Sequence, residues 1–301
     1  MDEATLGRIS APLVVAASAG AFFLSTGGLG TGWPLTWIAP IPVLLFAFRR
    51  SWRPTAIIAF LSYFLGGFTI LGLFRVGGLI IFAGPPAIAF MLAVLAARTA
   101  VHRLPPWRAA FMFPSAFTAY EFLYALISAN GTYCSIGYSQ TDVLPLLQLV
   151  SITGLWGVIF VLTLLPSSVA VGWDRGTVAP LAPALVILVA VLGYGSARLR
   201  WAPTLTTVRA RAAASDAAGP PLELASAYAD RIRRLRADGA EVVVIPEKLA
   251  AVSTEEFHAV TRVFSDAARS AHVRAIAGLD LRGSPWRNVA LVFTPTAAVT
   301  G

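Results

Sequence analysis

The chain has little charge and few residues of the types that bind metals or form disulfides. Only 13% of its 301 residues are charged, against about 25% in soluble domains, and 57% are hydrophobic. Such a chain cannot cover a water-facing surface of its own size, which indicates a membrane protein. The single cysteine, Cys134, excludes an internal disulfide framework and a multi-cysteine metal site. The three histidines lack ligand spacing, so we expect no metal and no cofactor.

The net charge of +8 does not indicate a nucleic-acid partner. The arginines occur in short clusters between apolar runs, where membrane topology explains them better than a nucleic-acid surface does. We therefore expect a membrane as the chain's environment and no nucleic acid among its partners.

Apolar runs over residues 1–200 predict a polytopic bundle of about seven transmembrane helices. About 20 apolar residues cross a bilayer core, and prolines inside such runs are tolerated in helices that pack in lipid. The runs cover residues 11–26, 35–48, 55–74, 78–97, 109–127, 149–172 and 179–194. A signal peptide is an alternative for the first run. Its leader holds Asp2 and Glu3 against Arg8 alone, which favours an uncleaved anchor.

The arginines predict how this bundle is oriented. Segments on one side of the predicted spans hold Arg8, Arg49, Arg50, Arg53, Arg98, Arg103, Arg108 and Arg175. On the other side lie Arg75 and the long segment 128–145, which has no arginine. The positive-inside bias then places the N-terminus in the cytoplasm. Seven spans put the remainder of the chain outside, although Arg198 and Arg200 run slightly against this orientation.

Residues 206–301 have regular charges and periodic apolar positions, which predict an α/β domain. Apolar residues on one helical face indicate a helix that ends near Gly239, and a capping box of Ser253 and Glu256 predicts the start of another. A fully buried strand is expected over 241–247, with two more over 273–279 and 289–294. The segment has fewer than 100 residues, which is few for helices to cover both faces of such a sheet.

The most informative carboxylate is Glu247, which follows the apolar run and Pro246. A carboxylate just past a buried strand occupies the place where α/β folds build active sites. Partial desolvation there suits it to act as a general base. The alternative is a loop glutamate beside a strand-ending proline.

Three further polar residues are candidate substrate-binding residues of the membrane half. Glu121 lies within an apolar run, where a carboxylate is costly and indicates function, although it can also pair with a neighbouring span. Tyr138 and Gln140 are expected at the outer membrane face, either contacting lipid headgroups or satisfying loop backbone.

Several motifs together resemble one family. Residues 243–247 and 287–294 are similar to two strands of the nitrilase, or carbon–nitrogen hydrolase, superfamily. Residues 33–40, 119–123, 137–141 and 148–154 resemble the membrane half of apolipoprotein N-acyltransferases. The resemblance covers essentially the whole chain. It implies a helical membrane bundle followed by an incomplete α/β domain of the α-β-β-α nitrilase-like kind on the extracytoplasmic side of a bacterial cytoplasmic membrane.

The resemblance also implies a reaction. Family members transfer an acyl chain from a phospholipid to the N-terminal cysteine amine of a diacylated lipoprotein through a thioester acyl-enzyme, using a Glu-Lys-Cys triad. Glu247 matches the glutamate, whereas the lysine and cysteine fall beyond Gly301. The only lysine, Lys248, adjoins Glu247 and does not match. The 301-residue chain alone is therefore expected to be inactive.

Two alternatives remain open. The first is a membrane-tethered carbon–nitrogen hydrolase or an inactive relative with the same fold. The second, more distant, is a transporter or receptor with an external ligand domain. That alternative requires polar residues along several spans, and only Glu121 and Arg75 come near this pattern.

Overall fold

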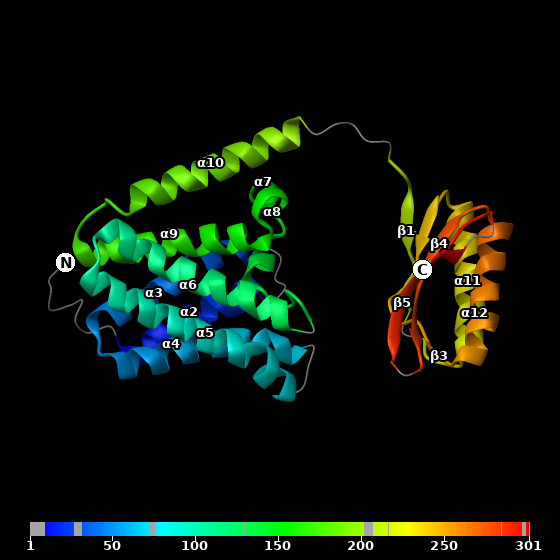
Figure 1. Cartoon of the computed structure of the whole chain (residues 1–301), viewed down its shortest axis with the longest axis horizontal. Coiled ribbons are helices and arrows are strands. Elements are labelled where there is room, and N and C mark those ends of the chain that lie inside the picture. The colour runs from blue at the N-terminus through cyan, green and yellow to red at the C-terminus, as the bar shows by residue number, and fades with distance from the viewer. Residues whose placement is uncertain are drawn as a thin grey trace. The chain divides into compact units, whose positions relative to one another are not determined.

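The computed structural model divides the chain into two compact units, residues 1–202 and 203–301. It describes residues 10–26, 32–72, 76–128, 130–201, 207–215, 217–283, 285–296 and 299–300, the side chains of 70, 72, 299 and 300 excepted. The predicted domain boundary at 206, and Arg8 and Arg75 of the topology argument, lie outside these residues. Each unit is described by itself (Figure 1).

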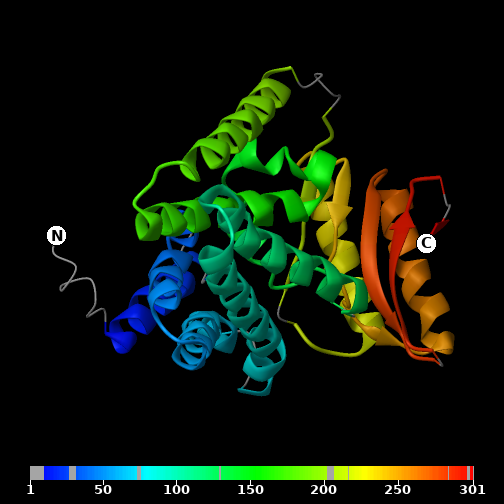
Figure 2. The same cartoon turned by 60° about the vertical axis from the view of Figure 1, so that its left-hand side comes forward.

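The first unit is entirely helical in its described part. Its α-helices are α2 (Ala11–Thr26), α3 (Pro40–Arg49), α4 (Trp52–Gly66), α5 (Val76–Arg103), α6 (Pro106–Ile127), α7 (Leu144–Leu147), α8 (Val150–Thr153), α9 (Leu155–Arg175) and α10 (Leu181–Arg200). Three 3₁₀ turns join them: η1 (Trp33–Trp37), η2 (Gly67–Gly72) and η3 (Ile136–Gln140). The last helix, α10, packs on α9 and α7 along one side of the bundle (Figure 2).

All seven predicted apolar runs fall on helices, but only some of these helices have the length of a membrane span. Four described helices, α5, α6, α9 and α10, are long and apolar enough to cross a membrane. The segments 11–26 and 33–49 are shorter apolar helices, and α4 has 15 residues. Prolines lie inside α5, α6 and α9 without ending them, as the sequence predicted. A bundle of seven spans remains a prediction.

Aromatic side chains form the centre of the first unit. The rings of Phe22, Tyr63, Phe90, Phe113 and Phe117 contact one another in edge-to-face, tilted and stacked pairs, with ring centroids 4.9–6.1 Å apart. They come from α2, α4, α5 and α6, so one cluster ties four helices together. Close packing of large rings supplies dispersion energy that does not depend on water being excluded, which suits a bundle in lipid.

Arg49, Arg98 and Arg175 lie at one end of the bundle, here called the arginine end, whereas Arg198 near the end of α10 donates to Gln148. Arg49 pairs with Asp174 at 3.4 Å between α3 and α9. The Arg98 Nε donates to the Arg50 carbonyl oxygen at 2.7 Å, and Arg175 donates to the Val101 carbonyl oxygen. Residues far apart in sequence therefore meet on one side of the bundle, as the alternation of arginine between the apolar runs predicted.

The second unit is a small mixed sheet with two helices. Its strands are β1 (Ala210–Ala212), β2 (Val242–Val244), β3 (Ala251–Val252), β4 (Arg274–Leu281), β5 (Arg287–Phe293) and β6 (Val299–Thr300). Strands β1, β2 and β4 pair in parallel, and β4, β5 and β6 pair antiparallel. The short β3 also pairs in parallel with β4. The helices are α11 (Pro221–Ala237) and α12 (Thr254–Ser270).

Both helices cover the same face of the sheet (Figure 1). Val243, Ala275, Ala277, Leu291 and Phe293 alternate along the strands and are buried against the helices. Val244 points the other way and remains 39% exposed. The expectation of a fully buried strand over 241–247 was therefore wrong, because the described helices cover only one side of the sheet and successive side chains alternate between faces.

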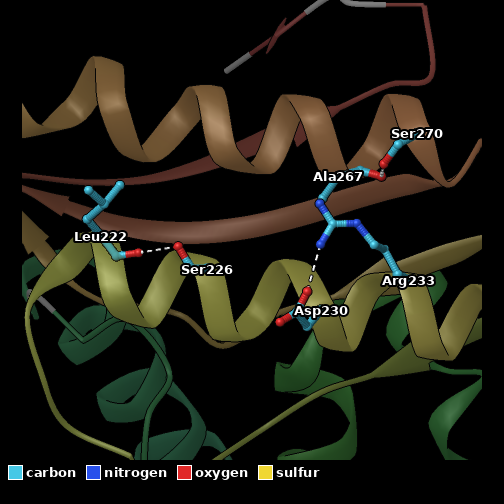
Figure 3. Close-up of polar contacts among 6 residues, drawn as sticks. All are labelled: Leu222, Ser226, Asp230, Arg233, Ala267 and Ser270. Atoms are coloured by element: carbon cyan, nitrogen blue, oxygen red, sulfur yellow. Dashed lines mark hydrogen bonds and ion pairs between the residues drawn. The ribbon is translucent and has the colours of Figure 1, made fainter.

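Local signals in the sequence did predict the helix ends of this unit. Gly239 has φ +89° just after α11, and Ser253 and Glu256 form the capping box that opens α12. Polar side chains on the helix surfaces bond locally, including Asp230 with Arg233 at 2.7 Å, Ser226 with Leu222 and Ser270 with Ala267 (Figure 3).

Candidate functional site

Glu247 lies in a bulge between two strands that both pair with β4. Residues 242–244 pair with 274–276, and residues 251–252 pair with 280–281, all in parallel. Six residues, 245–250, therefore lie opposite only three, 277–279. The surplus residues leave the plane of the sheet, and Glu247 is exposed at this point. Extra residues of this kind re-aim side chains in many active sites.

Gly278 allows the bulge to lie directly over the sheet. A Cβ atom at Gly278 would come within 2.7 Å of the Glu247 Cα and 3.0 Å of the Pro246 carbonyl oxygen. The Gly278 N–H donates to the Pro246 carbonyl oxygen at 3.3 Å, and Leu249 N–H donates to the Gly278 carbonyl oxygen at 3.0 Å. Gly278 shares the face of Ile276, the one opposite the helices, so Glu247 overlies the helix-free face.

Asn288 holds the Glu247 carboxylate. Its Nδ2 donates to Glu247 Oε1, and it lies on β5 opposite Asp280. The two segments that carry the nitrilase-like motifs, 243–247 and 287–294, thus meet through this contact. The sequence reasoning included Asn288 in a motif but assigned it no role, because strand periodicity does not reveal which residue of another strand faces a bulge.

Lys248 follows Glu247 with a left-handed backbone, φ +55°, and is exposed. The structure shows no hydrogen bond or ion pair between Lys248 and Glu247 among the contacts of the described residues. The candidate site of the second unit is therefore the exposed Glu247 carboxylate, which accepts a hydrogen bond from the Asn288 side-chain amide.

The first unit has a cavity of about 680 Å³ at the end opposite the arginine end. Here it is called the loop cavity. It lies where α2 and α4 finish and where the segment 130–142 crosses the bundle. Its described lining residues are Phe22, Ser25, Thr26, Gly32, Trp33, Tyr63, Gly66, Gly67, Thr69, Phe82, Ala83, Pro86, Tyr133, Cys134, Ser135, Ile136, Tyr138, Ser139, Thr141 and Asp142.

Glu121 lies behind one wall of the loop cavity. It is 8% exposed, near the end of α6, and its Oε1 accepts from the Ile136 backbone N–H at 3.5 Å. Ile136 and its neighbour Ser135 both line the cavity. The carboxylate therefore supports the segment that forms the wall and is separated from the cavity by one layer of residues.

Tyr138 and Gln140 occupy different environments although both lie on η3. Tyr138 lines the loop cavity, is about half exposed, and its hydroxyl shares a 2.6 Å hydrogen bond with Thr132 Oγ1. Gln140 is fully buried: its Oε1 accepts from Trp37 Nε1 at 2.9 Å, and its Nε2 donates to the Trp33 carbonyl oxygen at 3.2 Å. Gln140 thus joins η3 to η1.

Cys134 also lines the loop cavity and has φ +64°. Burial, followed by the nearby Glu121 carboxylate, raises the pKa of its thiol to about 11. A thiol with a raised pKa is a poor nucleophile at neutral pH, so this cysteine is not an activated one. Within the described part of the chain, no group of three or more His, Cys, Asp or Glu residues is placed to hold a metal ion.

Comparison with known proteins adds one finding. The model of the apolipoprotein N-acyltransferase N-terminal domain matches residues 18–168, which include most of the first unit and the whole segment around the loop cavity. The match does not extend to the second unit. No curated protein matches the chain.

Proposed function

Because the chain belongs to the apolipoprotein N-acyltransferase family, we propose that it carries the membrane unit and the general base of a lipoprotein N-acyltransferase. The family match supports the substrate class, which is a phospholipid acyl donor and a diacylated lipoprotein acceptor. The observation that supports the site is the position of Glu247, which overlies the helix-free face of the sheet and accepts a hydrogen bond from Asn288.

In the proposed reaction Glu247 removes the proton from a cysteine thiol. The thiolate attacks the acyl ester carbonyl of a phospholipid, a C–S bond forms, and the ester C–O bond breaks as lysophospholipid leaves with a proton. The lipoprotein's α-amine then attacks the thioester, so an amide forms and the thiol is restored. The cysteine and the lysine that would hold the oxyanion have no match in residues 1–301, so the proposal places both on further sequence.

We also propose the membrane arrangement that this reaction needs. The arginine end faces the cytoplasm, and the loop cavity opens toward the outer leaflet of a bacterial cytoplasmic membrane. The α/β unit from about residue 206 lies on that outer side. Both substrates are anchored in lipid, so an enzyme that is itself embedded in the membrane can reach them.

The test uses the protein with its natural downstream sequence, a fluorescent phospholipid donor and a diacylated lipopeptide acceptor. Glu247→Gln keeps the shape of the side chain and removes the base, so thioester formation should fall by about 10²–10⁴-fold. Lys248→Ala in the same bulge and Glu255→Ala in the first turn of α12 are matched controls and should change the rate only a few-fold. If Glu247→Gln forms the thioester at the wild-type rate, Glu247 is a structural loop residue and the proposal fails.

A further inference from the structure

The described lining of the loop cavity combines aromatic side chains with a negative charge. Six aromatic residues contribute to it: Phe22, Trp33, Tyr63, Phe82, Tyr133 and Tyr138. Asp142 is its one carboxylate, and no arginine, lysine or histidine occurs among the lining residues that the structure describes. The cavity is therefore suited to a ligand that brings positive charge with it.

A second acidic side chain lies behind the wall of the loop cavity. Glu121 is bonded to the Ile136 N–H and lies next to Cys134, both of which are part of the lining segment. Neither carboxylate has an ion-pair partner among the salt bridges of the described residues. The Asp142 carboxylate beside a partly apolar hollow creates a negative potential that concentrates cations there.

Aromatic rings and a carboxylate together form a recognised environment for ammonium groups. The face of an aromatic ring attracts a cation placed within about 6 Å of its centre, and a carboxylate adds a direct ionic contact. An anionic group would meet no positive side chain in the described lining. A volume of about 680 Å³ holds a small headgroup together with the first part of an apolar chain.

We infer that the loop cavity binds the ammonium group of a lipid, with Asp142 and the surrounding aromatic side chains contacting the cation. The inference takes from the proposed function only that the ligands are lipids, and it requires no acyl transfer. Two sources share this chemistry: the headgroup amine of a phospholipid and the free α-amine of a lipid-modified N-terminus.

The chain contains its own reporter of occupancy. Cys134 is its single cysteine and lines the cavity, so at mildly alkaline pH, where more of the thiol is ionised, a bound ligand should slow its alkylation by a maleimide. The experiment measures this rate by mass spectrometry for the 301-residue protein in neutral maltoside micelles. The probes are lysophosphatidylethanolamine and lysophosphatidylglycerol with the same acyl chain, and a diacylated lipopeptide with a free or an acetylated α-amine.

We expect protection of Cys134 by at least one of the two amine-bearing probes, and none by its amine-free counterpart at the same concentration. Protection by lysophosphatidylethanolamine alone assigns the site to a phospholipid headgroup. Protection by the free-amine lipopeptide alone assigns it to an acceptor α-amine, and protection by both means that the cavity selects the ammonium group whichever molecule carries it.

Asp142→Asn removes the charge with little change in shape, at an exposed position where folding should be unaffected. The concentration of amine probe needed for half protection should rise about five- to tenfold, as expected for loss of one ionic contact near a surface. Glu223→Gln, an exposed acid-to-amide change on α11 of the other unit, is the matched control and should have no effect.

The inference is overturned if amine-free probes protect equally, if neither amine probe protects, or if Asp142→Asn leaves protection unchanged. These results are independent of the acyl-transfer assay. A protein that binds ammonium lipids but forms no thioester would contradict the proposed reaction alone, and the reverse result would contradict only the ammonium site.

Discussion

The two units use glutamate in opposite ways. In the first unit Glu121 is almost fully buried and accepts from a backbone N–H, so it supports a wall segment. In the second unit Glu247 is exposed on a bulge and is held by the Asn288 side chain. In the first unit helix packing encloses a carboxylate that lies in an apolar stretch of sequence, whereas in the second unit the strand geometry leaves one exposed at the surface.

The units also differ in what positions their polar groups. The first relies on side chains that join loops across the bundle, such as Gln140 between η3 and η1. The second relies on backbone register, where a three-residue surplus and one glycine decide where Glu247 lies. Substitutions that disturb each kind of positioning should therefore have separate consequences.

The largest expected effect concerns the sides of the membrane on which the units lie. Reporter fusions at Arg50, Gly131 and Asp280 should read cytoplasmic, external and external, because the arginine end favours the cytoplasm. Activities of a periplasmic alkaline phosphatase and of a cytoplasmic reporter at the same sites provide the measurement. A cytoplasmic signal at Asp280 would place the second unit on the other side and contradict the proposed orientation.

Gly278→Ala tests the register-based positioning of Glu247. Its Cβ would overlap the backbone of Glu247 and Pro246, so the bulge must shift at a cost of about 1–3 kcal/mol. Hydrogen–deuterium exchange in the detergent-solubilised protein should increase over residues 245–250 and remain unchanged in the first unit. Gly219→Ala, where the nearest atom is 4.0 Å from the new Cβ, is the control. Equal exchange in both variants would show that the bulge does not need Gly278.

Glu121→Ala tests the enclosed carboxylate. It removes the acceptor of the Ile136 N–H and leaves a buried donor unpaired, which costs about 1–3 kcal/mol. Thermal unfolding in maltoside should therefore begin at a lower temperature than for the parent protein. Glu121→Gln keeps an acceptor oxygen, so its unfolding temperature should fall less than that of Glu121→Ala. An equal loss with glutamine and with alanine would mean that the charge, rather than the hydrogen bond, supports the wall.

The smallest expected effect lies at the start of α12. Ser253→Ala removes the capping hydrogen bond to the Glu256 N–H and should destabilise the helix by about 1 kcal/mol. Faster amide exchange in the first turn of α12, with Ser270→Ala as control, would confirm it. No change in that turn would show that packing alone defines the helix start.

The same capping box predicts a dependence on pH. The Ser253 backbone N–H, then its hydroxyl, lowers the pKa of Glu256, with a smaller effect from Arg282. A depressed folded-state pKa means that the stabilisation is complete above the unfolded value of about 4.3 and is lost as pH falls through the folded value. The protection of the first-turn amides, measured relative to their intrinsic exchange rate at each pH, should fall on acidification in the parent protein and much less in Glu256→Gln. Equal acid sensitivity of both would contradict this assignment.

Much of this architecture could be predicted from sequence because its causes are local. Apolar runs of helical length predicted the longer helices of the first unit, although they missed α7 and merged α8 with α9. Ser253 with Glu256 predicted the start of α12 correctly to the residue. Periodicity also predicted the order of α11, β2, α12, β4 and β5 in the second unit, but not the short strands β1, β3 and β6. The number of full spans did not follow, since run length in the sequence exceeded helix length at α4, where η2 continues the chain as a 3₁₀ turn.

What the sequence determined by itself is the class of molecule: a largely apolar helical unit with its arginines on alternate connections, then an α/β unit with a carboxylate after a strand. These properties depend on composition and on residues close in the chain. Only the tertiary structure decided that Asn288 bonds Glu247, that Gly278 admits the bulge, and that Asp142 joins six aromatic residues at one cavity. Those contacts join residues tens of positions apart, and their geometry depends on strand register and helix packing, which no local pattern encodes.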